Sequence, residues 1–286
     1  LEQRVRGGAM SPDEATASIK RVSDQLVEPN AVGDITALVA RLNALKPVIG
    51  MQREQRREER TKKIEESRAR EILILAGDHI YLTSYRNMLA YHPTQGADAT
   101  VAVYSVPREE AHRFGVLDLD GNGRIIDFQE KPQQPRSPWV SMGIYCFNKD
   151  VLVEALQADA EDELSKHDFG RNIIPRIYQT HRVFGYQYMG YWRDVGTVES
   201  YWSSHMDLIS PRPPLELDDP DIRLRTAGSI QAPAHIGARA VVQDALISPG
   251  ARIQGMVLRS VISPGVIIEP GAIVRDSVIS HRCVIQ

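Results

Sequence analysis

The end of the chain repeats a pattern with a step of about six residues. After Ser229, aliphatic residues recur at that interval, and Pro-Gly pairs stand at 249–250, 264–265 and 270–271. Short strands that each turn one aliphatic residue inward, separated by sharp corners, are typical of the hexapeptide repeat of a parallel β-helix. Proline fixes φ and glycine accepts positive φ, as such corners require. We therefore expect residues 229–286 to form about three coils of a β-helix. The residues expected to face inward in the later coils are Ile253, Ile267, Ile273, Ile279 and Ile285.

A second feature indicates an α/β domain earlier in the chain. The apolar run 72–76 is followed by Gly77 and Asp78, which is typical of a strand buried on both faces in a parallel sheet. Ligands of such sheets bind beyond the carboxyl ends of the strands. Gly77 would let the backbone approach a ligand, and Asp78 would point into the crevice as a ligand for a metal or a hydroxyl. The alternative is a strand end with a capping aspartate.

The region from Glu71 to about Leu208 alternates between strand and helix patterns. Strands are expected at Ala99–Val106 and Gly143–Phe147, and a short helix at 151–158. The turn residues 121–123 lie between two alternating segments and predict a β-hairpin.

Five segments of this region, taken in order, resemble the glucose-1-phosphate adenylyltransferases, also called ADP-glucose pyrophosphorylases. The resemblance extends from Lys62 to Gln286. It implies a nucleotide-diphospho-sugar transferase domain of Rossmann-like α/β type, incomplete here, followed by a left-handed β-helix. The segments are Ala76-Gly77-Asp78-His79-Ile80-Tyr81, Phe114-Gly115-Val116-Leu117 with Glu130-Lys131-Pro132, Ser141-Met142-Gly143-Ile144-Tyr145, His167-Asp168-Phe169-Gly170 and Tyr191-Trp192-Arg193-Asp194-Val195-Gly196-Thr197.

The family reaction joins ATP to glucose 1-phosphate and yields ADP-glucose and pyrophosphate. Such transfers depend on positioning and on neutralisation of charge. The resemblance therefore implies a Mg²⁺ cofactor held by Asp78 and Asp194, with Asp78 as the catalytic carboxylate. For Asp194 the alternative is a helix-capping role before residues 195–197.

The resemblance also implies a sugar site. Glu130 would accept hydrogen bonds from glucose hydroxyls, and Lys131 would meet the sugar phosphate as a point charge. The alternative for this pair is a surface ion pair. Ser141, immediately before an expected strand at 142–145, resembles a sugar-binding serine or is a turn residue. Asp168 would shape the glucose pocket, and His79 is expected to serve as a hydrogen-bonding framework.

The first part of the chain does not resemble the family. Residues 1–61 are expected to be helical, and no catalytic constellation is found in them. The mixed-charge run 53–71 predicts a solvated helix. The glycine-rich loop of the family, roughly GGGxGTRL, does not occur in the sequence, and Gly7-Gly8 lacks its context. We expect the chain to be a fragment, or the product of a rearranged reading frame, that is truncated at both ends. Such a chain would be poorly active alone. The alternative is a non-catalytic regulatory or assembly subunit.

Composition narrows the remaining possibilities. Residues 62–208 are expected to form the incomplete transferase domain and 209–228, rich in proline and acidic residues, a linker. A net charge of −3 gives no reason to expect a nucleic-acid partner. Two distant cysteines and the lack of a long apolar run predict a cytoplasmic protein without a membrane span. The resemblance to the family implies a homo-oligomer, namely a tetramer. A hexapeptide-repeat acyltransferase is disfavoured, since only His235 and His281 lie in the short repeat region.

Overall fold

The computed structural model describes residues 17, 46–215, 217 and 231–286. The chain divides into two compact units, Leu1–Ile72 with Lys149–Glu163, and Leu73–Asn148 with Leu164–Gln286. The helices predicted between residues 11 and 45 and most of the predicted linker lie outside the described residues. Among the described helices, none has the length and apolar character needed to cross a membrane.

Two helices make up most of the described part of the first unit. α4 (Lys46–Glu66) contains most of the mixed-charge run, and α7 (Lys149–Ala160) includes the predicted short helix. Lys149 Nζ donates hydrogen bonds to the main-chain oxygens of Glu65 at 3.4 Å and of Ser67 at 3.2 Å. The lysine thereby satisfies carbonyl groups that the end of α4 leaves without intrahelical partners.

The second unit is built on a six-stranded sheet of order β5-β4-β6-β3-β7, with β1 paired to β6. β3 runs parallel to β7 but antiparallel to β6, and β4 is antiparallel to both β5 and β6. The sheet is therefore mixed, with both parallel and antiparallel pairs. The strands are β1 (Glu71–Ile74), β3 (Ala99–Ser105), β4 (Gly115–Leu119), β5 (Ile125–Glu130), β6 (Trp139–Asn148) and β7 (Val183–Gln187).

The described helices of the second unit are short. Their bounds are α5 (Tyr85–Thr94), α6 (Arg108–Ala111), the π-helix η1 (Phe169–Ile173), α8 (Ile174–Thr180) and α9 (Val198–Leu208).

The strands buried on both faces are β3 and β6, not β1. The first five residues of β3 are buried, and in β6 most residues of both alternating sets are buried. On one face Met142, Ile144 and Cys146 pack with Met88 of α5. β1 was predicted to be buried on both faces, but its residues are exposed or only partly buried, and Leu75 is 45% exposed. The apolar run correctly indicates hydrophobic side chains. Their burial, however, depends on the neighbours of the strand, and in the described sheet β1 pairs with β6 alone.

The predicted hairpin is present between β4 and β5. Asp120 Oδ1 accepts hydrogen bonds from the main-chain nitrogens of Asn122 and Arg124, both at 2.9 Å. Gly123 follows with φ of +83°, a conformation that glycine adopts without steric cost. This turn reverses the chain and makes β4 and β5 antiparallel.

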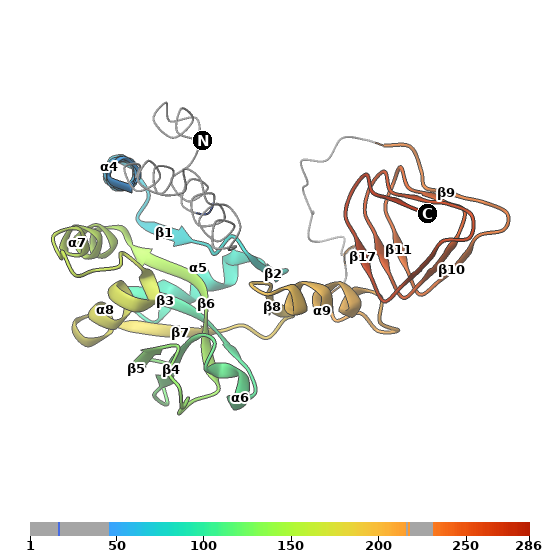
Figure 1. Ribbon diagram of the computed structural model, residues 1–286. Helices are drawn as coiled ribbons and strands as arrows, with labels where there is room; N and C mark the ends of the chain where they lie inside the picture. The colour runs from blue at the N-terminus through green and yellow to red at the C-terminus, as the bar shows by residue number, and fades with distance from the viewer. Residues whose placement is uncertain (1–16, 18–45, 216, 218–230) are drawn as a thin grey trace, which may run out of the picture. The chain divides into compact units, whose positions relative to one another are not determined.

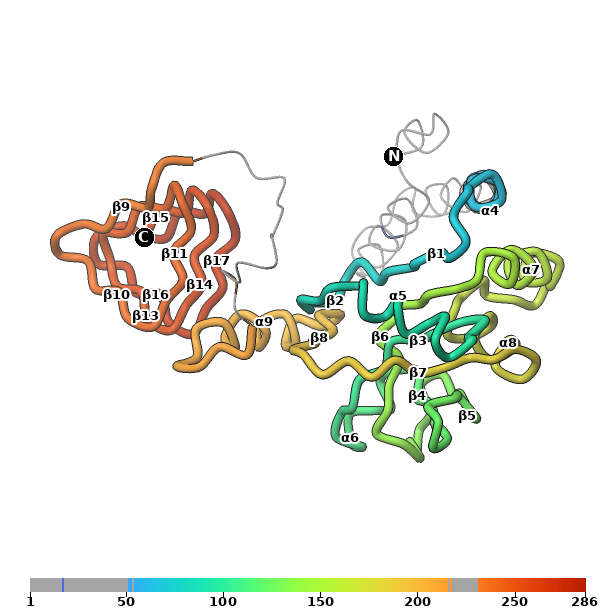
Figure 2. Tube along the Cα trace, turned by 180° about the vertical axis from the view of Figure 1, so that it is seen from behind, coloured from blue at the N-terminus to red at the C-terminus, as the bar shows by residue number. Residues whose placement is uncertain are grey.

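Residues 235–285 form a parallel β-solenoid with three sheets, seen end-on in Figure 1 and from behind in Figure 2. Its corners contain Gly250, Gly265 and Gly271, with φ values of +79°, +72° and +90°. The predicted Pro-Gly corners are thus confirmed. The sheets consist of β9 (His235–Ile236), β12 (Arg252–Ile253), β15 (Ile267–Ile268) and β18 (Val284–Ile285); β10 (Val241–Gln243), β13 (Met256–Leu258) and β16 (Ile273–Arg275); and β11 (Leu246–Ile247), β14 (Val261–Ile262) and β17 (Val278–Ile279).

The inward ladder differs from the prediction in its middle part. Ile253 is fully buried as expected, and Ile279 and Ile285 pack against the solenoid core. At the expected positions 267 and 273, however, the neighbouring Ile268 and Val274 are the buried residues, and Ile273 is 64% exposed. The six-residue count that reaches Ile267 and Ile273 passes through Val261, whereas the neighbouring Ile262 is the buried residue. Its next two steps therefore select the wrong one of two adjacent aliphatic residues.

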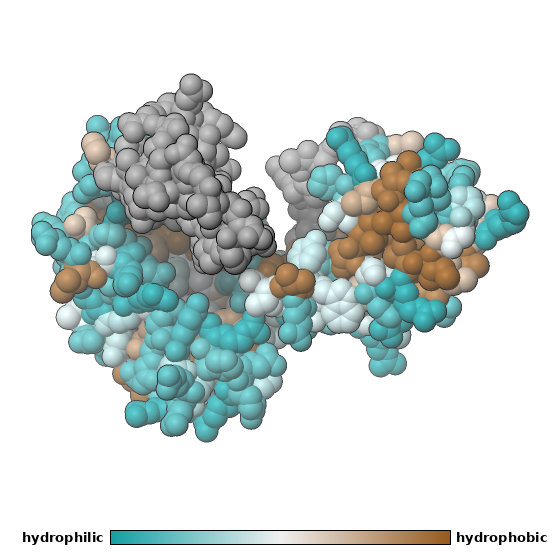
Figure 3. Space-filling model, in the orientation of Figure 1, coloured by the Kyte–Doolittle hydropathy of each residue, from teal (hydrophilic) through white to brown (hydrophobic). Residues whose placement is uncertain are grey.

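Hydrophobic side chains remain exposed on the solenoid. Figure 3 shows hydrophobic surface gathered on one face of this part of the chain. The exposed large aliphatic residues of the solenoid are Ile236, Val241, Leu246, Ile273 and Val284.

Candidate functional site

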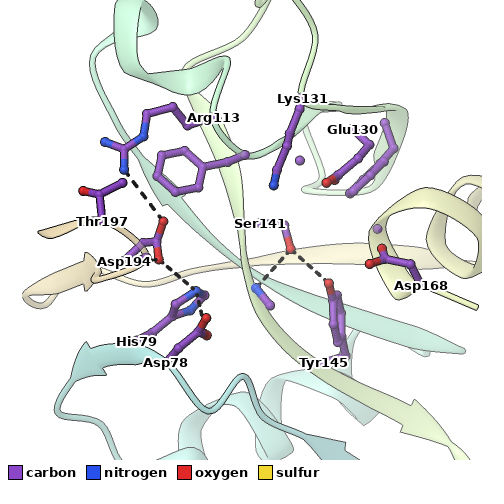
Figure 4. A pocket seen from close by; sticks show the side chains of 16 residues that line it. Asp78, His79, Arg113, Glu130, Lys131, Ser141, Tyr145, Asp168, Asp194 and Thr197 are labelled. Carbon is purple, nitrogen blue, oxygen red and sulfur yellow. Dashed lines mark hydrogen bonds and ion pairs between the residues drawn. The ribbon is translucent and has the colours of Figure 1, made fainter. Parts of the chain in front are cut away.

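A cleft of about 510 Å³ in the second unit contains all the site residues that the sequence predicted (Figure 4). It is lined by the end of β5, by residues inside β6, by the segment before η1, and by two short strands, β2 (His79–Tyr81) and β8 (Trp192–Asp194). The predicted residues in its lining are Asp78, Glu130, Lys131, Ser141, Asp168 and Asp194.

The pairing of β2 with β8 brings the two predicted metal ligands together. These strands are antiparallel, with His79 directly opposite Asp194. Asp78 precedes β2, and one ligand atom from each of Asp78, His79 and Asp194 lies within 4.8 Å of the others. The side chain of Asp78 is 73% exposed, whereas that of Asp194 is 21% exposed. One carboxylate is thus open to the solvent and the other is held in the wall.

Asp194 is held in place by a main-chain amide and by an arginine. Its Oδ1 accepts a hydrogen bond from the main-chain nitrogen of Gly196 at 3.0 Å, and its Oδ2 lies 4.0 Å from Arg113 Nη2. The next helix, α9, is capped by Thr197 and Ser200 in a reciprocal capping box. Because Thr197 is the N-cap, the alternative of Asp194 as a helix cap is wrong.

Glu130 and Lys131 lie where β5 leaves the sheet. Lys131 has φ of +49°, unusual for a residue with a β-carbon, and its main-chain nitrogen donates to Phe114 O at 3.0 Å. Both side chains line the cleft with Asp168, whose Oδ1 accepts a hydrogen bond from Arg171 N at 2.9 Å. The alternative of a simple surface ion pair does not account for this position in a cleft.

Ser141 lies inside β6 and is 9% exposed, rather than preceding a strand as predicted. Its Oγ accepts a hydrogen bond from Gly143 N at 3.2 Å and lies 3.5 Å from the hydroxyl of Tyr145. Tyr145 stacks on Phe169 with ring centroids 5.3 Å apart. A polar edge on a rigid aromatic wall is well suited to the hydroxyl groups and apolar face of a sugar.

Burial shifts two ionisable groups of this half of the cleft. Burial raises the pKa of Glu130, the charge of Asp168 adds to that shift, and Lys131 and Arg171 oppose it. Burial likewise raises the pKa of Tyr145 to about 12, so its hydroxyl stays protonated and can donate a hydrogen bond at neutral pH.

Sequence reasoning missed Arg113 and gave Tyr145 no role. Arg113 directly precedes the Phe114-Gly115 segment and lies with its guanidinium 5.6 Å from the centre of the Phe114 ring. The signal available in the sequence was a basic residue directly before one of the segments that resemble the family. Its approach to Asp194 depends on two segments that are far apart in the chain.

The donor set fits a hard divalent cation. Two carboxylates converge from separate strand ends, and the Asp78 side chain is exposed, so water or phosphate oxygens could complete the coordination of an ion held there. The positive charge of Arg113 and Lys131 borders the same cleft. Carboxylates that suit a divalent cation and basic groups that suit a phosphate thus line one cleft.

Comparisons with known proteins agree with this geometry. The family model for nucleotidyl transferases matches residues 58–210. The chain is 46% identical over 211 residues to a glucose-1-phosphate adenylyltransferase of Fervidobacterium nodosum, covering 74% of this chain and 51% of that protein. It is 44% identical over 215 residues to one of Acetivibrio thermocellus, covering 75% and 50%. The chain thus spans about half the length of the curated relatives it matches.

Proposed function

Because the chain belongs to the nucleotidyl transferase family, we propose that its cleft is the site of a sugar nucleotidyltransferase that uses ATP and glucose 1-phosphate. An oxygen of the sugar phosphate attacks the α-phosphorus of ATP. The bond from this phosphorus to the oxygen that bridges to the β-phosphate breaks, and pyrophosphate leaves with the electron pair. The observation that carries the proposal is the convergence of Asp78 and Asp194 in the cleft that also holds Glu130 and Lys131.

Asp78 and Asp194 would hold Mg²⁺ at the end of β2 and β8. When bound, Mg²⁺ supplies positive charge that offsets the charge of the phosphates. Arg113 limits the repulsion between Asp194 and an incoming phosphate, since its guanidinium lies 4.0 Å from that carboxylate. No general base is needed, because the second pKa of a phosphate monoester is about 6 and the nucleophile is already ionised at neutral pH.

The sugar half of the site would position glucose 1-phosphate. Lys131 provides the cation for the sugar phosphate, and Glu130 accepts hydrogen bonds from the glucose hydroxyls. Ser141 and Tyr145 supply further hydroxyl groups on the wall formed by β6. Asp168 acts by positioning, since its carboxylate is engaged by Arg171 N.

We further propose that this polypeptide turns over slowly on its own. Its sequence contains no GGGxGTRL segment, which in the resembling family binds the triphosphate. Removing one preorganised donor from an active site typically costs about 10²–10³ in rate, and such a loop supplies several. A non-catalytic regulatory or assembly subunit with an intact sugar-phosphate site is the second candidate. The exposed aliphatic residues of the solenoid support a homo-oligomer.

The test combines binding with turnover. Titration calorimetry should detect weak binding of glucose 1-phosphate that Lys131→Ala abolishes, while pyrophosphate release with ATP and Mg²⁺ should be several orders of magnitude below that of an intact relative. No binding of glucose 1-phosphate at all would overturn the site. Turnover within about tenfold of the relative, about 1.4 kcal/mol in barrier, would overturn the slow-turnover part.

A further inference from the structure

We propose that Arg113 is a second phosphate-binding residue of the cleft, which meets the phosphate that the nucleotide contributes while Lys131 meets that of the sugar. This inference rests on the proposed function, because it assigns a further partner to a substrate of the same site. It gives Arg113 two opposite effects, since the arginine should weaken the binding of a metal ion alone and strengthen the binding of a sugar nucleotide.

The hydrogen-bonding capacity of the Arg113 guanidinium is unused. The group makes no hydrogen bond to any residue that the structure describes, and its Nη2 lies 4.0 Å from Asp194 Oδ2, which is too far for one. By contrast, Arg193 Nη2 donates a hydrogen bond to Asp207 Oδ2 at 2.7 Å. A guanidinium carries five N–H donors, so Arg113 can donate to a ligand without giving up a hydrogen bond within the protein.

The protein nevertheless restricts where this guanidinium lies. Arg113 N donates a hydrogen bond to the main-chain oxygen of Glu110 at 3.2 Å, which fixes the backbone in a turn at the end of α6. The guanidinium lies 5.6 Å from the centre of the Phe114 ring, and its planar shape suits contact with an aromatic face. An arginine that is already ordered in this way loses less conformational freedom when it binds an anion.

Arg113 and Lys131 belong to one wall of the cleft. Lys131 N donates a hydrogen bond to the main-chain oxygen of Phe114, the residue that follows Arg113, so the two cations are carried by backbone segments in direct contact. Figure 4 shows both side chains extending into the cleft from the same side, Arg113 toward Asp194 and Lys131 nearer to Ser141. A sugar nucleotide carries two linked phosphates, one from each substrate. Two neighbouring cations, one on the metal side and one on the sugar side, fit such a diphosphate.

The contact with Asp194 explains why Arg113 should oppose a metal ion that binds alone. A positive charge 4.0 Å from the carboxylate weakens the attraction of that carboxylate for a second cation. The effect is moderate, because the side chains of Arg113 and Asp194 are 37% and 21% exposed and water screens them. A phosphate beside the metal reverses the balance, since it attracts both cations. Arg113 therefore favours the metal and the diphosphate together over the metal by itself.

The experiment is titration calorimetry of the full chain with Mg²⁺ alone, and with glucose 1-phosphate and ADP-glucose at saturating Mg²⁺. The variants are Arg113→Gln, which removes the charge, and Arg113→Lys, which keeps the charge without the planar fork. The matched control is Arg108→Gln, which removes the same charge from α6. Arg108 lies outside the lining of the cleft and donates a hydrogen bond from Nη2 to Arg136 O at 2.9 Å. Circular dichroism checks that each variant is folded.

We expect the affinity for ADP-glucose to fall at least about tenfold in Arg113→Gln and less in Arg113→Lys. The affinity for glucose 1-phosphate should change by less than about twofold, and Mg²⁺ alone should bind at least about twofold more tightly to Arg113→Gln. Arg108→Gln should match the unmodified chain in all three titrations.

Two results would overturn this inference and leave the proposed function intact. One is ADP-glucose affinity that Arg113→Gln leaves unchanged, or lowers only as much as it lowers that for glucose 1-phosphate. The other is weaker binding of Mg²⁺ to Arg113→Gln, which would make Arg113 a positioning residue for Asp194 alone. An unmodified chain that binds neither glucose 1-phosphate nor ADP-glucose would overturn the proposed function itself.

Discussion

Gly170 stands so close to Glu130 that a β-carbon at position 170 would lie 2.7 Å from Glu130 Oε2. Gly115 approaches the same oxygen, at 3.1 Å from its own virtual β-carbon. Two residues without side chains thus leave the space that the Glu130 carboxylate occupies. The position of this carboxylate in the cleft depends on glycines from two other segments of the chain.

Replacement of Gly170 by alanine should therefore weaken sugar-phosphate binding without unfolding the protein. The added methyl group meets the end of a flexible side chain, so Glu130 is displaced while the backbone stays in place. We expect affinity for glucose 1-phosphate to fall about tenfold, equivalent to 1.4 kcal/mol, in calorimetry. Gly121→Ala is the control, since nothing lies within 4 Å of its virtual β-carbon. Equal affinities in the two variants would contradict this account.

Glu130→Gln should separate stability from binding. Burial raises the folded-state pKa of Glu130, so its ionised form is less favourable in the folded than in the unfolded protein. The resulting loss of stability is absent at low pH and develops as the pH rises above 4.5, the ordinary value. The glutamine variant should melt at a higher temperature than the unmodified chain near pH 7 and show no such gain near pH 4. Its affinity for glucose 1-phosphate should nevertheless fall. A lower melting temperature at pH 7 would be inconsistent with a costly buried charge.

Asp98 should stabilise the second unit in a pH-dependent manner. Burial alone would raise its pKa, but hydrogen bonds and charge from Arg182 outweigh burial and lower it. Asp98 Oδ2 accepts from Arg182 N at 2.9 Å, and Oδ1 lies 3.3 Å from Arg182 Nη2. A lowered pKa means that the stabilisation is present above the ordinary value of 3.8 and is lost as the pH falls through the lowered pKa.

We expect Asp98→Ala to cost about 1–2 kcal/mol at pH 7 and much less at pH 2–3, measured by denaturant unfolding. A double-mutant cycle with Arg182→Ala isolates the pair. A cost for Asp98→Ala that is independent of pH would show that the carboxylate charge has no part in it.

The solenoid offers a matched pair of isoleucines for a test of its register. Ile268 is fully buried, whereas Ile273, which the six-residue count places inside, is 64% exposed. Ile268→Ala should cost about 2–5 kcal/mol of unfolding free energy, because it leaves a cavity in the core. Ile273→Ala should cost less than about 0.5 kcal/mol. Similar costs for the two substitutions in guanidinium unfolding would restore the register expected from the sequence.

Several features follow from local chemistry and could be predicted from the sequence. The hairpin at Asp120–Arg124 depends on a side-chain cap and a glycine, and the solenoid corners depend on Pro-Gly pairs. The positions of Asp78 and Glu130 at the ends of strands were also evident, because a change from apolar to charged residues marks where a strand leaves the core. Each of these signals lies within a few residues.

The assembled cleft could not be read from the sequence, because it depends on pairing between distant segments. The register that places His79 opposite Asp194, and the approach of Arg113 to that aspartate, are set by the antiparallel pair β2–β8 and by packing around Trp192. The burial of the solenoid side chains also could not be read from the sequence. Which of Ile267 and Ile268 faces inward depends on corners of unequal length, and a shift of one residue turns a side chain to the opposite face of a strand. Sequence determined the elements and their chemistry, while tertiary pairing decided which atoms meet.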